Sequence, residues 1–254
     1  MENSDWWKPN NLKKSEKKFL DENDLEKLDV NNDFGSYKVM LATNDTSMSL
    51  IHAHNDITPS FRVKTLKKIL GDFNPQKIYD LGCGLGYTTN EISKLYPLAE
   101  VIGIDISNDA ITYAEKNFPN CQFLCEAVDP ENKKHLLGAD LICAFEFYPF
   151  TRTNILSDHV QYISYLSDEL SEKGKLVIFQ LWDKPESLSV NYKDLLSSCP
   201  NLKFELHSIP IKKIGKFVGS SFLANAISEI ARIISRVVIN RNLGKNKMLV
   251  ISKN

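Results

Sequence analysis

The chain has 254 residues, a length that fits one large domain or two small ones. Apolar residues make up 43% of it and charged residues 25%, which is typical of a globular protein and argues against disorder, collagen-like repeats and a disulfide-stapled miniprotein. The net charge of −1 hides an uneven distribution, because residues 210–247 contain eight Lys or Arg and a single acid. This basic segment suits either an anionic partner or a solvated helix face.

Targeting and cysteine patterns indicate a reducing compartment. We find no run of about 18 uninterrupted apolar residues, as a membrane span requires, and no apolar signal core near the start. The five cysteines form no CxxC pair. We therefore expect a cytoplasmic protein with free thiols, without a disulfide or a bound metal.

The first 59 residues are mostly polar, apart from the pair Trp6 and Trp7, and we interpret them as an arm that pins to the body or closes over a ligand as a lid. Helical spacing of apolar residues begins at Ser60, a predicted N-cap, and stops at Gly71. The expected domain therefore spans residues 60–254.

Strands and helices then alternate along the chain. The pattern predicts a strand over 77–80, a glycine turn and a helix over 87–95, and Ser107 as the cap of a later helix. It also predicts a helix that Ser157 caps and Gly174 ends. The remaining strands are expected at 100–105, 121–128, 139–145, 175–182, 203–209 and 247–252. Such alternation predicts an α/β fold with a doubly wound, seven-stranded parallel sheet.

The last two strands are separated by a long basic insertion, residues 210–246. Within it, residues 222–239 place aliphatic side chains on one stripe, with Arg232 and Arg236 elsewhere, so we predict an amphipathic helix. We expect this helix to pack on the sheet or to cover its ligand edge; an oligomer contact or a membrane surface is the alternative.

The chemistry is indicated by the glycine turn Gly82-Cys83-Gly84-Leu85-Gly86, which follows Asp80, and by Asp105 at the end of the next strand. Glycines there let the backbone approach a ligand, and an acid about 20 residues on accepts ribose hydroxyls. A dinucleotide fingerprint would need glycine at Tyr87. Asp80 also suits a cation better than a pyrophosphate, so a sulfonium amino acid is the better ligand.

These motifs resemble those of the class I S-adenosylmethionine-dependent methyltransferases, over residues 60–209 and the last strand. The resemblance implies a mostly parallel Rossmann-like sheet and S-adenosylmethionine as cofactor. It implies that Asp80, Gly82, Cys83, Gly84 and Gly86 hold the methionine part. It also implies that Asp105 holds the ribose, that Ile106, Glu126 and Ala127 adjoin the adenine, and that Phe145 and Glu146 face cofactor or acceptor.

Methyl transfer needs an aligned nucleophile, and a base only when that nucleophile is protonated. The candidates for that base are His52 and His54 in the lid, with Glu146 and Tyr148 after the fourth strand as rivals. Both histidines could also be solvent-facing loop residues. His159 is a further candidate or a surface residue in the first turn of its helix.

The expected acceptor is an oxygen or nitrogen of a small, anionic metabolite or sugar, including phosphorylated ones, for example in surface-carbohydrate or secondary-metabolite biosynthesis. DNA is not expected, because Phe147-Tyr148-Pro149-Phe150 lacks the polar residue that amino-methylating DNA enzymes carry there, and Cys199-Pro200 reverses the order that pyrimidine methylation needs. We do not expect a membrane-surface partner. A protein or RNA methyltransferase and a non-catalytic nucleoside-binding module are the alternatives, and the sequence leaves the oligomeric state open.

Overall fold

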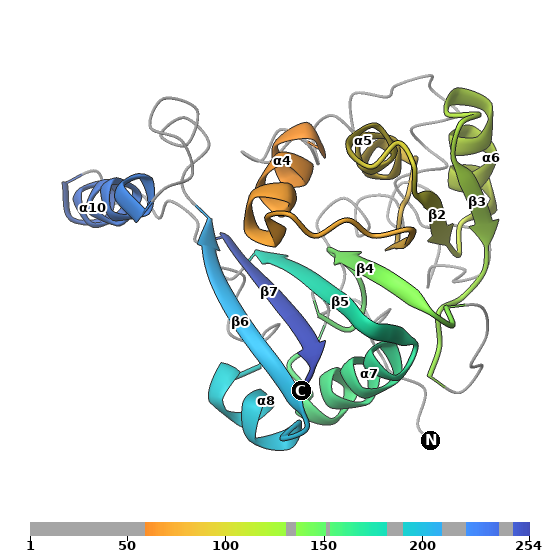
Figure 1. The fold of residues 1–254 in the computed structure, drawn as a ribbon. Coiled ribbons are helices and arrows are strands. Elements are labelled where there is room, and N and C mark those ends of the chain that lie inside the picture. The colour runs from red at the N-terminus through yellow and green to blue at the C-terminus, as the bar shows by residue number, and fades with distance from the viewer. Residues whose placement is uncertain (1–58, 131–135, 151–152, 182–189, 210–221, 239–245) are drawn as a thin grey trace, which may run out of the picture.

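The computed structural model describes residues 59–130, 136–150, 153–181, 190–209, 222–238 and 246–254 (Figure 1). Its centre is a seven-stranded sheet in the order β3-β2-β1-β4-β5-β7-β6. The strands are β1 (Lys77–Leu81), β2 (Glu100–Asp105), β3 (Gln122–Cys125), β4 (Ala139–Phe145), β5 (Leu170–Leu181), β6 (Leu202–Ile209) and β7 (Asn246–Lys253). The first five strands pair in parallel, and β7 runs antiparallel between β5 and β6.

Helices cover both faces of this sheet (Figure 1). On one side, α4 and α5 pack Val63, Leu66 and Ile92 against strand residues such as Ile78. On the other side, α7 and α8 pack Ile163 and other apolar residues. The helices are α4 (Pro59–Leu70), α5 (Tyr87–Leu95), α6 (Asn108–Asn117), α7 (Leu156–Asp168), α8 (Tyr192–Ser198) and α10 (Phe222–Val238). The doubly wound fold predicted from the alternation is confirmed, with α10 inserted before the last strand.

The strand order reverses at β1, which pairs with β2 on one side and with β4 on the other. In an open parallel sheet a ligand binds at such a switch point, outside the carboxyl ends of the strands. Asp80 in β1, Asp105 at the end of β2 and Glu146 just after β4 all lie toward this edge. The topology therefore brings together residues that are far apart in the sequence.

Two of the predicted caps are wrong. Ser60 lies within α4, which already includes Pro59, a residue favoured in the first helical turn. Ser157 lies within α7, whose N-cap position is Ile155. The Thr153 hydroxyl accepts a 3.0 Å hydrogen bond from the Ile155 N–H, and this local turn starts the helix earlier than Ser157. The predicted Ser107 cap is confirmed, because its side chain accepts a hydrogen bond from the Ala110 N–H.

Gly174 does not end α7, which stops at Asp168; the glycine lies inside β5 instead. A Cβ atom at Gly174 would stand 2.6 Å from the carbonyl oxygen of Ala139, on the neighbouring strand. The register of β4 on β5 shifts at this point, between Ala139 and Leu141. Close backbone approach at a bulge, and not helix termination, therefore explains this glycine.

The predicted third strand is too long. β3 ends at Cys125, and the next two residues, Glu126 and Ala127, are exposed. The Glu126 N–H still donates a 3.0 Å hydrogen bond to the carbonyl oxygen of Asp105, which holds the start of this loop beside the end of β2.

Candidate cofactor and acceptor site

The glycine turn between β1 and α5 is bonded to the neighbouring strand. The backbone N–H groups of Gly82 and Cys83 donate to the carbonyl oxygen of Ile104, at 2.8 and 3.1 Å. Gly82, Gly84 and Gly86 have φ values of 68°, 54° and 78°, which side-chain-bearing residues rarely adopt. The turn therefore bends at the end of β1 in a conformation that requires these glycines.

Gly86 also has a packing role. A Cβ atom there would stand 2.9 Å from both the Ala114 side chain and the Phe123 ring. The neighbouring Cys83 side chain is buried in the same cluster, and burial raises the pKa of its thiol well above the usual value. Close packing of the turn on α6 and β3 therefore accounts for the side chain of Cys83 and for the absence of one at Gly86.

Asp105 is the acid best prepared for a ligand. One carboxylate oxygen accepts the Gly84 N–H at 2.8 Å and the other accepts the Ser107 N–H at 2.9 Å. Each oxygen keeps further acceptor capacity, because an ionised carboxylate has about four lone-pair sites. Burial raises the pKa of Asp105, while the bonds from Ser107 and Gly84 oppose that effect. A rigid carboxyl group that can accept two hydroxyl hydrogens suits the adjacent hydroxyls of a ribose.

Asp80 is a buried carboxyl, 1% exposed, whose oxygen Oδ2 accepts the Thr89 hydroxyl at 2.7 Å. Burial raises the pKa of Asp80 to about 7, against the lowering effects of the Thr89 hydrogen bond and of the Arg62 charge. The nearby Asp105 charge adds to the increase. At neutral pH this group is therefore close to half ionised, and a cation placed beside it would favour the charged form.

Arg62 is a residue of the candidate site that the sequence analysis missed. It projects from α4, and its Nη2 atom donates to Glu146 Oε1 at 2.8 Å. The guanidinium also lies 5.8 and 5.2 Å from the ring centroids of Phe145 and Phe179. Its Nε atom is buried and has no hydrogen-bond partner among the described residues. The sequence did contain a signal for Arg62: it lies four residues before Leu66, on the apolar stripe of the predicted helix, and buried stripes rarely carry a charge.

The segment after β4 closes the other side of the turn. Glu146 has φ 57°, an unusual value for this residue type. The next residue, Phe147, lies over the glycine turn, because a Cβ atom at Gly82 would stand 3.1 Å from its ring. Phe145 is 4% exposed and packs edge-on against Phe179. The pattern that pointed to Phe145 and Glu146 therefore marks residues around Arg62 and the turn.

Tyr148 and His159 have structural partners. The Tyr148 hydroxyl donates to Asp158 Oδ2 at 3.3 Å, and its ring packs edge-on against Tyr162. His159 is 1% exposed, with Nε2 placed 2.9 Å from the Thr153 carbonyl oxygen, and burial lowers its pKa. The alternative that His159 is a surface residue is wrong, because its ring packs against Phe150 in the core.

The remaining predicted residues divide into two groups. Ile106 is half-buried directly after β2, and the exposed residues Glu126 and Ala127 start the loop bonded to Asp105. His52, His54, Trp6 and Trp7 lie outside the described residues. Among the residues that the structure does describe, no three His, Cys, Asp or Glu side chains gather as a metal site would require, and no helix has the length and apolarity to cross a membrane.

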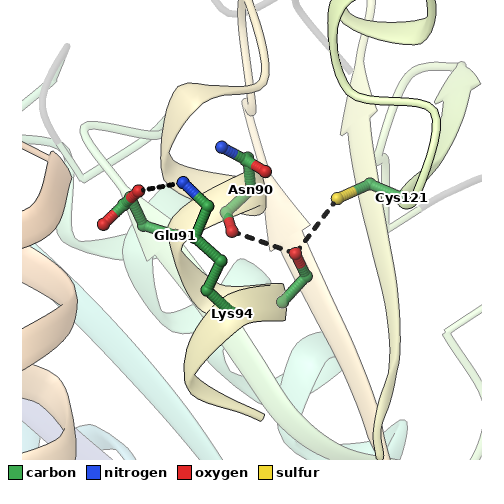
Figure 2. Close-up of polar contacts among 5 residues, drawn as sticks. Asn90, Glu91, Lys94 and Cys121 are labelled. Atoms are coloured by element: carbon green, nitrogen blue, oxygen red, sulfur yellow. Dashed lines mark hydrogen bonds and ion pairs between the residues drawn. The ribbon is translucent and has the colours of Figure 1, made fainter. Parts of the chain in front are cut away.

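A hollow of about 300 Å³ lies at the other end of α5, lined by Asn90, Ser93, Lys94, Pro97, Ala99 and Asn120. Figure 2 shows that two of its polar side chains have partners next to the hollow: Lys94 pairs with Glu91 at 2.7 Å, and the Ser93 hydroxyl accepts from the Cys121 thiol at 3.4 Å. The last turn of α5 precedes the amino end of β2, so this hollow is at the edge opposite Asp105. We assign no function to it.

The sheet order, with a glycine turn after β1 and Asp105 at the end of β2, is that of the class I methyltransferase fold. A family model described as a methyltransferase domain matches residues 74–227. The chain therefore belongs to the methyltransferase domain family.

Solved structures agree on the fold. The plantazolicin methyltransferase BpumL in complex with SAH superposes with a TM-score of 0.54 at 21% identity, over 83% of this chain and 91% of that chain. A TehB-like SAM-dependent methyltransferase from Corynebacterium glutamicum gives 0.50 at 17% identity, over 85% and 99%. Among curated relatives, the trans-aconitate 2-methyltransferase of Yersinia pseudotuberculosis is 29% identical over 108 residues, which span 41% of this chain but only 38% of that relative.

Proposed function

We propose that this protein is an S-adenosylmethionine-dependent methyltransferase that transfers a methyl group to an oxygen or nitrogen of a small molecule. The observation that carries the proposal is Asp105, whose two carboxylate oxygens are each fixed by one backbone N–H and retain capacity for a ribose diol. Asp105 lies beside a glycine turn with a left-handed backbone. This placement fits a carboxylate that binds a nucleoside better than one that only bonds the backbone of the turn.

The charges around Asp80 fit the methionine part of this cofactor. The cofactor supplies a positively charged sulfonium that activates its methyl group. Asp80 offers a buried negative partner for positive charge, and Arg62 offers a buried Nε–H for a carboxylate. Because Arg62 also lowers the pKa of Asp80, the two groups favour one another's charged states. We assign to Gly82 and Gly84 a close backbone contact with the methionine part of the cofactor.

Positioning is the proposed catalytic contribution. Glu146 is bonded to Arg62 and Tyr148 to Asp158, so both are held in defined orientations after β4. Glu146 can accept a proton directly from an acceptor hydroxyl or amine that arrives protonated, whereas Tyr148 can do so only as its own hydroxyl proton passes to Asp158. His52 and His54 stay predictions as lid residues. The described residues would hold the acceptor in line with the methyl group, and the Phe147 ring over the turn would exclude water.

A small, anionic acceptor is the finer part of the proposal. The relatives named above include enzymes named for trans-aconitate and for plantazolicin, which supports acceptors other than DNA. The eight basic residues of segment 210–247 support a negatively charged one. A screen of phosphorylated sugars and carboxylate metabolites for donor consumption tests this, and turnover of neutral acceptors alone would contradict it.

The decisive experiment for the cofactor is calorimetric titration of wild-type, Asp105→Ala and Asp140→Ala proteins with S-adenosylmethionine. Loss of a charged acceptor should cost about 1.5–3 kcal/mol, so Asp105→Ala should bind roughly 10- to 100-fold more weakly. Asp140 is the matched control, because its carboxylate also accepts two backbone N–H groups, of Gln76 and Lys77, at the opposite edge of the sheet.

Asp140→Ala should therefore lower stability without changing cofactor affinity. NAD serves as the ligand control. No binding of S-adenosylmethionine by the wild-type protein, or tighter binding of NAD, would overturn the proposal. Binding without turnover of any acceptor would favour the alternative of a non-catalytic nucleoside-binding module.

A further inference from the structure

Helix α10 buries small side chains and exposes large aliphatic ones, which is the reverse of what is expected of a helix that only packs on the protein body. Its small residues Ala224 and Ser228 are fully buried, at 0% exposure. Its large aliphatic residues are exposed: Leu223 by 58%, Ile230 by 56%, Ile233 by 62% and Ile234 by 52%. The prediction that this apolar stripe packs on the sheet or covers its ligand edge does not describe these four side chains.

The four side chains form one stripe. At about 100° per residue, Leu223, Ile230 and Ile234 lie within roughly 40° of one another around the helix axis, and Ile233 lies beside them. Among the described residues, four of the seven large hydrophobic side chains that are exposed belong to this helix, whereas Leu98, Leu137 and Ile155 come from three other places in the chain. Clustered exposure of this kind marks an interaction surface.

The charge of the segment selects the partner. Residues 210–247 carry eight Lys or Arg and only Glu229 as an acid, so the helix and its flanking sequence are strongly cationic. A second copy of the chain on the same stripe would bring two such cationic segments together. An anionic lipid surface instead meets the aliphatic stripe with acyl chains and the cations with headgroups.

The placement of α10 suits this partner. With 17 residues the helix is short for a membrane span, and an amphipathic helix of this kind lies in the plane of the interface. In Figure 1 it stands beyond the ends of β6 and β7, apart from the helices that cover the sheet. We propose that α10 docks the protein on an anionic lipid bilayer through Leu223, Ile230, Ile233 and Ile234. This inference is independent of the proposed cofactor.

Vesicle flotation of the full chain tests the proposal. The wild-type protein should float with phosphatidylcholine vesicles that contain about one third phosphatidylglycerol, more weakly with pure phosphatidylcholine, and less as salt rises. The double substitution Ile230→Glu and Ile233→Glu should weaken binding at least about tenfold, since two aliphatic groups no longer enter the interface. Leu98→Glu is the matched control, at an 85% exposed leucine outside α10, and should bind as the wild type does.

Three outcomes would overturn the proposal. The first is a wild-type protein that stays with the unbound fraction at low salt, and the second is a double variant that binds anionic vesicles as the wild type does. A dimer in size-exclusion chromatography that the double substitution converts to monomer, without vesicle binding, would assign the stripe to a second copy. The same proteins are titrated with S-adenosylmethionine as a control. Equal affinities show that the variants are folded. If none of the proteins binds the cofactor, that result contradicts the proposed function and not the docking of α10.

Discussion

At the scale of single residues, Asp80 makes cofactor affinity depend on pH. Burial raises its pKa to about 7 in the ligand-free protein, and only the ionised form attracts positive charge. Affinity for S-adenosylmethionine should therefore rise as pH increases from about 5.5 to 7.5, because progressively less free energy is needed to ionise Asp80. Calorimetry across this range measures the effect. Asp80→Asn should bind weakly with a flat profile, and a wild-type affinity independent of pH would contradict the assignment.

The same residue should lower the stability of the ligand-free protein. The folded-state pKa of Asp80, about 7, lies above the unfolded value of 3.8, so its stabilising contribution is present below about pH 3.8 and is lost as pH rises through 7. The full difference amounts to about 4 kcal/mol. Asp80→Asn, which keeps an acceptor for the Thr89 hydroxyl, should unfold at higher denaturant concentration than wild type at pH 8. The gain should shrink towards pH 4; a constant gain would point to a cause other than ionisation.

At the scale of elements, the Arg62–Glu146 pair joins α4 to the end of β4. Their side chains are only 12% and 20% exposed, so removing one partner leaves a largely buried charge. Arg62→Ala should lower the free energy of unfolding by about 3 kcal/mol in denaturant titrations. It should also weaken cofactor binding at pH 7, because the pKa of Asp80 rises further. Lys94→Ala, which breaks the exposed Glu91 pair on α5, is the control and should cost under about 0.5 kcal/mol.

Two glycines separate backbone strain from packing. Gly71 and Gly86 both have left-handed φ values, 60° and 78°, but a Cβ atom meets nothing within 4 Å at Gly71 and meets Ala114 and Phe123 at 2.9 Å at Gly86. Gly71→Ala should therefore cost only the conformational penalty of about 1–2 kcal/mol. Gly86→Ala should cost an additional 1–3 kcal/mol or so from overpacking. Equal losses in thermal unfolding would show that the contact of the turn with α6 and β3 is loose.

At the scale of the whole molecule, the sequence predicts what depends on local pattern. Alternating apolar strands and helices predict the sheet, and the spacing from Asp80 through the glycines to Asp105 predicts the candidate nucleoside site. Arg62 escaped prediction because its partner, Glu146, is 84 residues away in the chain and meets it only after folding. The exposure of the aliphatic face of α10 could not be predicted either, because an amphipathic pattern indicates that one face is apolar but does not show what covers that face.

Helix α10 follows the carboxyl end of β6, at the same edge of the sheet as Asp105 but on the far side of β5 and β7, and this placement yields a prediction for the whole molecule. A ligand that binds only the folded state, at about 100 times its Kd, stabilises a protein by about 2.7 kcal/mol. For a chain of this size that corresponds to a rise in Tm of roughly 5–10 °C, since each kcal/mol shifts Tm by about 2–4 °C. S-adenosylmethionine at one fixed concentration should therefore raise the Tm of the wild-type protein and, equally, of the Ile230→Glu and Ile233→Glu double variant. With affinity 10- to 100-fold weaker, the rise in Asp105→Ala should fall to between about one half and one sixth of the wild-type rise. Loss of the rise in the α10 variant would mean that the two surfaces are coupled, because a ligand can shift only those equilibria that its own contacts distinguish.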